Sequence, residues 1–482
     1  MEDPDDLETL LARTTEHALA YRRSLRTRPV AAAASTESVH EQLSALGSVP
    51  EAGLRPAQVL EELVQLAAPG LTAMSGPRFF GWVTGGTLAS ALAADWLTAT
   101  WDQNAGPATG APAAAAFELV ALRWVGQLLG LPEQARGALV TGATLANLSA
   151  LAGARSRVLA AADWDVEHDG LFGAPPVRVL VGRERHASID KALRLLGFGK
   201  RALRVVEADA QGRLRPASLR VELAAWHGPV IVCAQLGNVD SGAFDPVDEI
   251  ADVLAEWRKD SAEGLAWLHV DGAFGLWARA SSSLAPLARG VERADSWATD
   301  AHKTLNVPYD SGIVLTRHPE AQRRAMAISA AYLASGGAAS LPNPGALSPE
   351  LSRRARSFAL WAALRELGRQ GVDELVTRCA AHARQFASEL ATVAGLRVLN
   401  EVVFNQVVLG AEPRAGSEPQ ESVRELCLEL QREGSCYATP TLWRGTPALR
   451  FSIVNSLTAE SDIQRSADAV RRVYARLRTA PL

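Results

Sequence analysis

Residues 267–274 read Trp-Leu-His-Val-Asp-Gly-Ala-Phe, an apolar run that ends in a carboxylate and two small residues. Short apolar runs of this kind are typical of strands that are buried on both faces of a sheet. We expect strands at 177–181, 230–235, 267–271 and 312–316, with helical patterns at 188–196 and 245–258 between the first three. This alternation predicts an α/β fold with a mostly parallel central sheet between helices. In such sheets, ligands bind at the carboxyl ends of the strands.

The regions on either side of this centre have different patterns. Residues 1–85 have helical periodicity at 5–26 and 55–67 around a linker at 27–36, and they predict an N-terminal helical arm or cap. Residues 86–352 form the predicted large domain, with further helices at 88–101, 113–129 and 145–159 and a strand at 138–140. Residues 353–482 predict a smaller α+β domain, with helices at 353–370, 372–393, 420–433 and 459–478 and strands at 397–399, 402–409 and 448–454.

The composition of the chain argues against several classes of protein. Its 482 residues suit two or three packed domains, and its net charge of -4 offers no basic surface for nucleic acid or an anionic membrane. The four cysteines form no CxxC pair and the acidic N-terminus resembles no secretory signal, so we expect a reducing, cytoplasmic setting. The apolar stretch 82–101 is rich in Gly, Ala and Thr and contains Asp95, which favours a buried helix and loop over a membrane span.

Two segments outside the quoted strand could bind the parts of a flat, phosphorylated ligand. The stretch Thr141-Gly-Ala-Thr-Leu-Ala-Asn147 lies between a predicted strand and a helix, and small side chains there let backbone N–H groups approach a phosphate. We expect Gly142, Ala143 and Thr144 to form this phosphate cup, although a plain tight turn has the same pattern. His186 follows another predicted strand, where an imidazole could stack on a planar ring or be an ordinary loop histidine.

Two further segments supply a carboxylate and an amine. Asp271 ends the quoted strand, where a buried charge needs a partner, and Ala273 leaves room above it for a flat ligand. Lys303 is one of only four lysines in the chain and, unlike the other three, it has mostly uncharged neighbours. Burial is expected to lower the pKa of such a lysine and make it reactive as an amine, with His302 beside it. A snorkelling surface lysine is the alternative.

Taken together, the four segments contain the parts of a pyridoxal site: a phosphate cup, a stacking ring, an acid under the pyridine nitrogen and a lysine that binds the cofactor. No metal is expected in this interpretation. The rival from another class is a metallohydrolase in which His269 with Asp271, and Asp300 with His302, bind a metal ion. A nucleotide-binding module or silent scaffold is disfavoured because the chain has no Gly-x-Gly-x-x-Gly and no Walker lysine loop.

Across nearly its whole length, the chain resembles the group II pyridoxal 5′-phosphate (PLP) dependent decarboxylases, the family of the aromatic-L-amino-acid, glutamate and histidine decarboxylases. The shared motifs are Pro77-Arg-Phe-Phe80, residues 141–147, His186 with Ser188, Gly237-Asn-Val-Asp-Ser-Gly-Ala-Phe-Asp-Pro246, His269-Val-Asp-Gly-Ala273, His302-Lys303 and Ala448-Leu-Arg-Phe-Ser452. The resemblance implies the type I PLP fold and a homodimer with active sites at the subunit interface. It also implies decarboxylation of an L-amino acid, with aromatic side chains as the leading expectation, to the amine and CO2.

The resemblance assigns roles to further residues. It implies that Lys303 binds PLP covalently, that Asp271 holds the pyridine proton, that His186 stacks on the ring and that Tyr332 protonates the substrate carbon. His302, Ala273 and the phosphate cup complete the cofactor site, and the expected substrate-binding residues are Phe79, Phe80, Trp82 and Trp101. Thr304 departs from the family pattern, which often has tryptophan after the lysine. A transaminase or an aldehyde synthase would keep the same lysine and aspartate, so both remain alternatives.

Overall fold

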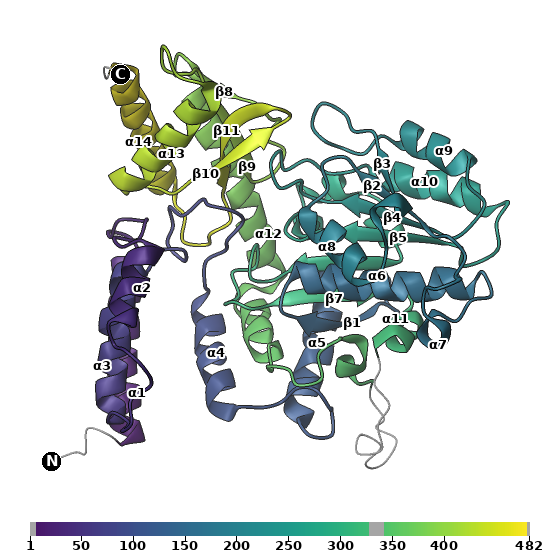
Figure 1. The fold of residues 1–482 in the computed structure, drawn as a ribbon, viewed down its shortest axis with the longest axis horizontal. Helices are drawn as coiled ribbons and strands as arrows, with labels where there is room; N and C mark the ends of the chain where they lie inside the picture. The colour runs from purple at the N-terminus through teal and green to yellow at the C-terminus, as the bar shows by residue number, and fades with distance from the viewer. Residues whose placement is uncertain (1–5, 327–341, 480–482) are drawn as a thin grey trace.

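The computed structural model describes residues 6–326 and 342–479. Its centre is a seven-stranded sheet with the order β1-β7-β6-β5-β4-β2-β3 (Figure 1). The strands are β1 (Arg136–Val140), β2 (Arg178–Gly182), β3 (Leu203–Val206), β4 (Val230–Gln235), β5 (Ala266–Asp271), β6 (Ser296–Asp300) and β7 (Gly312–Thr316). The predicted mostly parallel α/β sheet is confirmed, and two of its strands, β3 and β6, lie outside the strand ranges predicted from the sequence.

One strand of this sheet runs against the others. β7 pairs antiparallel with both β1 and β6, whereas β2, β3, β4, β5 and β6 pair in parallel. Only residues 301–311 connect β6 to β7, and a parallel crossover needs a longer connection. The reversal brings Gly312 against the turn between β1 and the helix that follows it: a Cβ on Gly312 would lie 2.4 Å from the Cα of Gly142.

Helices cover both faces of the sheet because the buried strands are apolar on both sides. α6 (Ala143–Ala160) packs on one face, where Ile231, Cys233 and Trp267 point into a shared cluster. α10 (Val247–Arg258) packs on the other, against alternate residues such as Val232 and Leu268. The remaining α-helices of this region are α4 (Ala89–Trp101), α5 (Pro112–Leu128), α7 (Val166–Asp169), α8 (Ala187–Leu195), α9 (Pro216–Ala224) and α11 (Pro319–Met326). Short 3-10 helices lie at Ala68–Gly70, Lys200–Ala202, Gly275–Ala280, Ala285–Ala288, Val291–Arg293 and Pro344–Leu347.

A second sheet follows in the C-terminal part of the chain. It has the order β10-β11-β9-β8, formed by β8 (Leu396–Val398), β9 (Gln406–Ala411), β10 (Thr439–Trp443) and β11 (Thr446–Ser452), and it packs with α13 (Pro419–Glu433) and α14 (Glu460–Thr479). α12 (Ser357–Ala391) connects the two sheets (Figure 1). It is interrupted at Gly368, whose φ is 58°, close to the gap between the two helices expected there.

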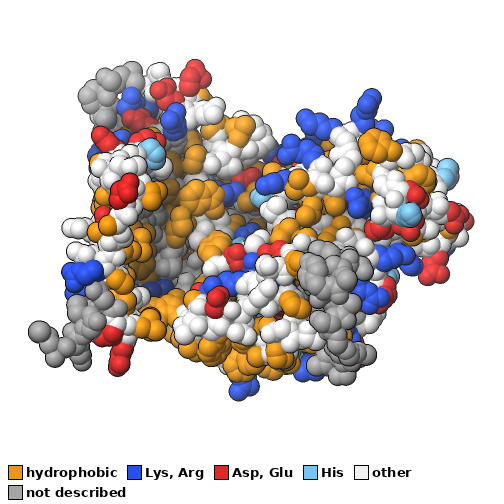
Figure 2. All heavy atoms as spheres, turned by 60° about the horizontal axis from the view of Figure 1, so that its bottom comes forward, with side chains coloured by type: hydrophobic (Ala, Val, Ile, Leu, Met, Phe, Trp, Pro, Cys, Tyr) orange, Lys and Arg blue, Asp and Glu red, His pale blue; other side chains and the backbone are white. Residues whose placement is uncertain are grey.

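The N-terminal helices stand beside the body of the molecule as an arm (Figure 1). They are α1 (Leu7–Ser24), α2 (Thr36–Ser44) and α3 (Pro56–Ala67), and neither α1 nor α2 buries a residue. The expectation that residues 82–101 are buried is wrong for much of α4, because Trp96, Leu97 and Trp101 stay exposed in the single chain. Figure 2 shows apolar side chains along the inner side of the arm, facing a hollow.

Among the helices of the described residues, none combines the length and the hydrophobicity that a membrane crossing requires.

Candidate active site

The carboxyl ends of three central strands and the first turn of α6 surround one cavity. β4 ends at Gln235, β5 at Asp271 and β6 at Asp300, and the cavity beside them has a volume of about 340 Å³. Its walls are formed by Val83, Thr141, Gly142, Ala143, Thr144, His186, Ser188, Gln235, Gly237, Val239, Asp271, Ala273, Phe274, Asp300, His302 and Lys303. All the residues expected to hold the cofactor therefore lie on one cavity wall, at the predicted edge of the sheet.

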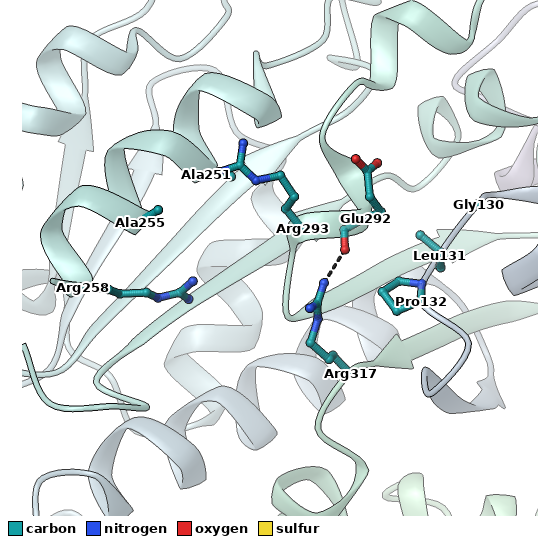
Figure 3. A pocket seen from close by; sticks show the side chains of 9 residues that line it. All are labelled: Gly130, Leu131, Pro132, Ala251, Ala255, Arg258, Glu292, Arg293 and Arg317. Atoms are coloured by element: carbon teal, nitrogen blue, oxygen red, sulfur yellow. Dashed lines mark hydrogen bonds between the residues drawn. The ribbon is translucent and has the colours of Figure 1, made fainter.

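A larger depression of about 650 Å³ lies elsewhere, beside α10, and contains no predicted site residue. Figure 3 shows three arginine side chains, Arg258, Arg293 and Arg317, in its wall. Arg258 pairs with Asp295 at 3.0 Å, Arg293 pairs with Asp252 at 2.7 Å, and Arg317 donates to a backbone carbonyl. These guanidinium groups are already engaged within the protein, so the smaller cavity is the stronger candidate for chemistry.

Lys303 reaches the cavity from the loop after β6, and its amine has a carboxylate partner. The Nζ atom lies 2.9 Å from Oδ2 of Asp300, which is itself buried. The expected lowering of the lysine pKa is wrong: burial does lower it, but the attraction of Asp300 and Asp271 outweighs burial and holds the pKa of Lys303 above its ordinary value. In the ligand-free chain, Lys303 is therefore an ammonium group paired with Asp300.

The carboxylate of Asp300 also contacts the predicted phosphate cup. The backbone N–H of Ala143 donates to Oδ1 of Asp300 over 2.7 Å, so Asp300 joins the first turn of α6 to Lys303. Gly142 is the N-cap of α6 and provides no side-chain cap. The carboxylate of Asp300 therefore occupies part of this helix end, and the remaining donors of the first turn, with the positive end of the helix dipole, face the cavity. His302 lies alongside, with Nε2 3.6 Å from Oδ2 of Asp300.

Asp271 is buried at the end of β5 and has the partners that a buried charge requires. Its Oδ2 accepts a hydrogen bond from Nδ2 of Asn147 at 3.1 Å, and its Oδ1 accepts one from the N–H of Ala273 at 3.3 Å. Burial raises the pKa of Asp271, and the nearby His186 and Lys303 limit that rise. An oxygen with one long hydrogen bond, such as Oδ1, can still accept a hydrogen bond from a protonated nitrogen of a ligand in the cavity.

His186 occupies the N-cap of α8 at the edge of the cavity. Its Nδ1 accepts a hydrogen bond from the backbone N–H of Ser188 at 3.2 Å and lies 2.8 Å from Oγ of the same serine. The backbone N–H of His186 donates to Oε1 of Gln235 at 3.1 Å, which ties the loop to the end of β4. The ring is therefore fixed at its Nδ1 side, while the histidine lines the cavity.

The expected substrate-binding aromatics are not brought to the cavity wall. Phe80 packs against Phe386 and Phe451 in the C-terminal core, and Phe79 stacks on Tyr437 at 4.8 Å. Trp101, at the end of α4, packs on Phe358. Trp82 is half exposed and lies next to Phe79 and Tyr437. Instead, Val83 lines the cavity. Tyr332 lies outside the described residues.

One proposed ligand of the metal-site alternative, His269, is already engaged by other side chains in the protein interior. Both ring nitrogens of His269 are engaged, Nε2 with Oδ1 of Asn147 at 2.9 Å and Nδ1 with Oγ of Ser296 at 2.9 Å. Over residues 6–326 and 342–479, no cluster of three or more His, Cys, Asp or Glu side chains is placed to hold a metal ion.

Three site residues were not assigned a role at this site from the sequence alone: Asn147, Gln235 and Asp300. Asn147 ends the cup segment 141–147, and the sequence marks Asp300 only as a candidate metal ligand beside His302. Gln235 is a polar residue at the end of an otherwise apolar strand, the same signal that singled out Asp271. Applying that signal to every predicted strand would have found it.

These side chains fit the cofactor that the resemblance implies. PLP requires an amine for its aldehyde, a carboxylate for its pyridine nitrogen, donors for its phosphate and room for a flat ring. Lys303, Asp271 and the N-terminal turn of α6 meet the first three needs within one cavity, and Ala273 keeps the wall beside Asp271 small. Cavities that hold small ligands commonly begin at about 300 Å³, so the measured volume is adequate.

Comparisons with known proteins agree with this fit. Residues 41–411 match the family model described as the pyridoxal-dependent decarboxylase conserved domain. The aromatic-L-amino-acid decarboxylase of Bacillus atrophaeus is 28% identical over 72% of this chain and 71% of its own length. The L-2,4-diaminobutyrate decarboxylase of Rhizobium meliloti (strain 1021) is 29% identical over 90% of this chain and 85% of its own. The crystal structure of Oryza sativa TDC with PLP and tryptamine superposes with a TM-score of 0.89 at 25% identity, covering 99% of both chains.

Proposed function

The chain belongs to the pyridoxal-dependent decarboxylase family, and on that premise we propose that it removes CO2 from an L-amino acid with an aromatic side chain and releases the amine. It is a PLP-dependent amino acid decarboxylase. The observation that carries the residue assignments is the convergence of Lys303, Asp271 and the N-terminus of α6 on one cavity.

The lining of the cavity supports an aromatic substrate. Val83, Val239 and Phe274 give it apolar surface. Among the described lining residues there is no arginine, and the one lysine, Lys303, is paired with Asp300. A substrate with a carboxylate in its side chain would be left without a cationic partner here, which is costly in a site with little water. Relatives of similar identity are named as an aromatic-L-amino-acid decarboxylase and an L-2,4-diaminobutyrate decarboxylase, and the panel of amino acids below includes both classes.

Each described residue has a distinct part in the proposed mechanism. When bound, PLP supplies an electron sink for the bond that breaks between Cα and the carboxylate. Lys303 would anchor the cofactor, and the first turn of α6 with Thr144 and His302 would hold its phosphate. Asp271 would accept the hydrogen bond of the pyridine nitrogen and so keep its proton in place. His186, at the edge of the cavity, would stack on the ring by resemblance. Tyr332, also by resemblance, would donate the proton to Cα.

A panel of L-amino acids tests the substrate. With the PLP-loaded protein, CO2 release from L-tryptophan, L-tyrosine or L-phenylalanine should exceed that from L-glutamate by at least about 100-fold in kcat/KM, because the side-chain carboxylate of glutamate would be buried without a cationic partner. L-2,4-diaminobutyrate is the second comparison, because Asp271 and Asp300 in the cavity wall could pair with its ammonium group. Amine and CO2 should appear in equal amounts. A faster reaction with glutamate or diaminobutyrate would contradict the aromatic assignment. Formation of a 2-oxo acid would indicate a transaminase, and aldehyde with ammonia would indicate an aldehyde synthase.

A second copy of the chain is the proposed partner of the arm. Apolar side chains are exposed on three of its helices and on α4: Leu7, Leu11, Leu19, Leu43, Val59, Leu63, Trp96, Leu97 and Trp101. An apolar surface of this kind is costly in water unless another surface covers it. We infer that a second copy covers this surface, in the homodimer that the family resemblance implies. The four cysteines are free and buried, which suits the reducing, cytoplasmic setting that we propose.

Trp96→Glu tests the dimer. The wild-type protein should have twice the chain mass of 51.2 kDa by light scattering, and the variant should dissociate at least about 30-fold more readily, because a buried interface tryptophan is a typical hot spot. Phe172→Glu is the matched control, since Phe172 is fully exposed on a turn and its replacement should leave the dimer intact. A monomeric wild-type protein, or a variant as dimeric as the wild type, would contradict the proposal.

A further inference from the structure

A buried chain of polar groups leads from the core of the sheet to Asp271. Nε1 of Trp267 donates to Oγ of Ser296 at 2.8 Å, and Ser296 lies 2.9 Å from Nδ1 of His269. Nε2 of His269 lies 2.9 Å from Oδ1 of Asn147, whose Nδ2 donates to Asp271. All five side chains are buried. Polar groups in such a place must be satisfied by one another, so the position of every hydrogen in the chain can be worked out.

The two ends of this chain determine its direction. The indole nitrogen of Trp267 can only donate, and the carboxylate of Asp271 can only accept. The carboxylate therefore requires the NH2 group of Asn147, which leaves the amide oxygen to face His269. That oxygen requires the hydrogen of His269 on Nε2, so Nδ1 accepts from the hydroxyl of Ser296. Burial lowers the pKa of His269 to about 3, which keeps the ring neutral with one hydrogen to place.

Asn147 is also connected to His186, through a branch of the same chain of hydrogen bonds. Its Nδ2 lies 3.2 Å from Oγ of Ser188, which lies 2.8 Å from Nδ1 of His186. Since the backbone N–H of Ser188 also donates to Nδ1, that nitrogen carries no hydrogen. The serine hydroxyl accepts from Asn147 and donates to His186. A neutral His186 therefore carries its hydrogen on Nε2.

We propose that Asn147 is a positioning residue for the reaction: its single NH2 group holds Asp271 as an anion at the cavity and, through Ser188, fixes the tautomer of His186. The inference rests on the proposed function only for its kinetic readout. Every hydrogen bond in the chain points toward Asp271, so the positive ends of the dipoles face the carboxylate and favour its charged form. His269 acts one step further back, by orienting Asn147.

Other titratable groups near Asp271 set the background for this effect. His186, Lys303 and the buried thiol of Cys233 face Asp271 from α8, from the loop after β6 and from β4. Asp300 and Arg450 act on His186 in turn. None of these groups is replaced in the Asn147 or His269 variants, and of them only His186 is joined to Asn147, through Ser188. The His269 variants keep Asn147 and Ser188 in place, so a difference between them reports the hydrogen-bonded chain that leads to Asp271.

Asn147→Ala removes the donor and tests the proposal. Asp271 then loses its hydrogen bond on Oδ2, its pKa rises further, and the anion is present only at higher pH. The acidic limb of the kcat–pH profile should move up by about one pH unit, so that kcat at pH values below the limb falls by up to about tenfold with little change in KM. The affinity of the ligand-free protein for PLP, titrated by absorbance across the same pH range, should weaken with the same shift.

Two substitutions of His269 separate positioning from simple packing. His269→Gln keeps an N–H donor for Asn147 and should retain an acidic limb close to that of the wild type. His269→Leu fills the space without a donor and should shift the limb in the same direction as Asn147→Ala. Equal behaviour of the two His269 variants would overturn the assigned direction of the chain. If Asn147→Ala does not fold, Asn147→Asp keeps the side-chain size, removes the donor and should give the larger shift.

The two readouts distinguish this inference from the proposed function. If no amino acid yields CO2 but the pH dependence of PLP affinity shifts in Asn147→Ala, the proposed function fails and the role of Asn147 stands. If CO2 forms and Asn147→Ala changes neither the acidic limb nor the PLP affinity, the role of Asn147 is refuted and the proposed function stands.

Discussion

Lys303→Ala is expected to reduce CO2 release to the background level, because the variant cannot anchor PLP covalently. The protein should still fold, since Lys303 contributes one ion pair and its side chain is partly exposed at the cavity. The purified wild-type protein should show a visible absorbance band of bound cofactor that resists gel filtration, and the variant should lose it. Mass spectrometry after borohydride reduction should find the cofactor mass on the peptide that contains Lys303 in the wild type alone.

Two controls make the Lys303 result specific. Lys303→Arg keeps a positive charge beside Asp300 but has no amine that can bind an aldehyde, so it should be as inactive as the alanine variant. Lys259→Ala removes an exposed lysine that pairs with Glu256 and should leave turnover unchanged. Normal amine production by Lys303→Ala, or a cofactor mass on another lysine, would refute the assignment.

Asp271→Asn is expected to lower kcat by about 10²–10³-fold while the protein stays folded. The amide has the shape of the carboxylate but no charge, so it cannot hold the proton on the pyridine nitrogen. Asp252→Asn is the matched control, because Asp252 is an exposed carboxylate that pairs with Arg293 far from the cavity wall. Wild-type kcat in Asp271→Asn would show that this carboxylate does not act on the cofactor.

The same substitution has a predictable effect on stability. Burial raises the folded-state pKa of Asp271 above the unfolded value. A raised carboxyl pKa contributes stability that is present at low pH and is lost as pH rises through the folded pKa. Urea unfolding of ligand-free wild-type protein should therefore lose part of its stability with rising pH, and Asp271→Asn should not lose that part. At pH 7 the variant should be at least as stable as the wild type; a large destabilisation there would contradict this account.

The strand-end residues could be predicted from the sequence because each has a local signal. Asp271 interrupts an apolar run, and Lys303 has few charged neighbours, so both were found without knowledge of the fold. β6 was missed because a central strand with Ser296, Thr299 and Asp300 does not look buried. Those polar groups are tolerated since each has a partner inside the protein: Ser296 bonds Trp267, Thr299 donates to the carbonyl of Gly272, and Asp300 pairs with Lys303.

The role of the aromatic residues could not be predicted in this way. A phenylalanine in the sequence can equally line a cavity or fill a hydrophobic core. Phe79 and Phe80 lie in core clusters, which only the tertiary structure reveals. The exposure of the apolar side chains on α4 could not be predicted either. The sequence of an apolar helix does not indicate whether its own chain or another copy covers it. Asn147 was quoted as part of a turn, and its role depends on Asp271, which is 124 residues away in the sequence.

The reversed strand β7 has a consequence for which substitutions the protein can tolerate. Gly312 touches the backbone of Gly142 so closely that any side chain there would push on the floor of the phosphate cup. A methyl group at position 312 would therefore act as if it had been placed in the cup itself, although the two glycines are distant in the sequence. Engineers who vary loops near the cofactor should treat the start of this strand as part of the binding site.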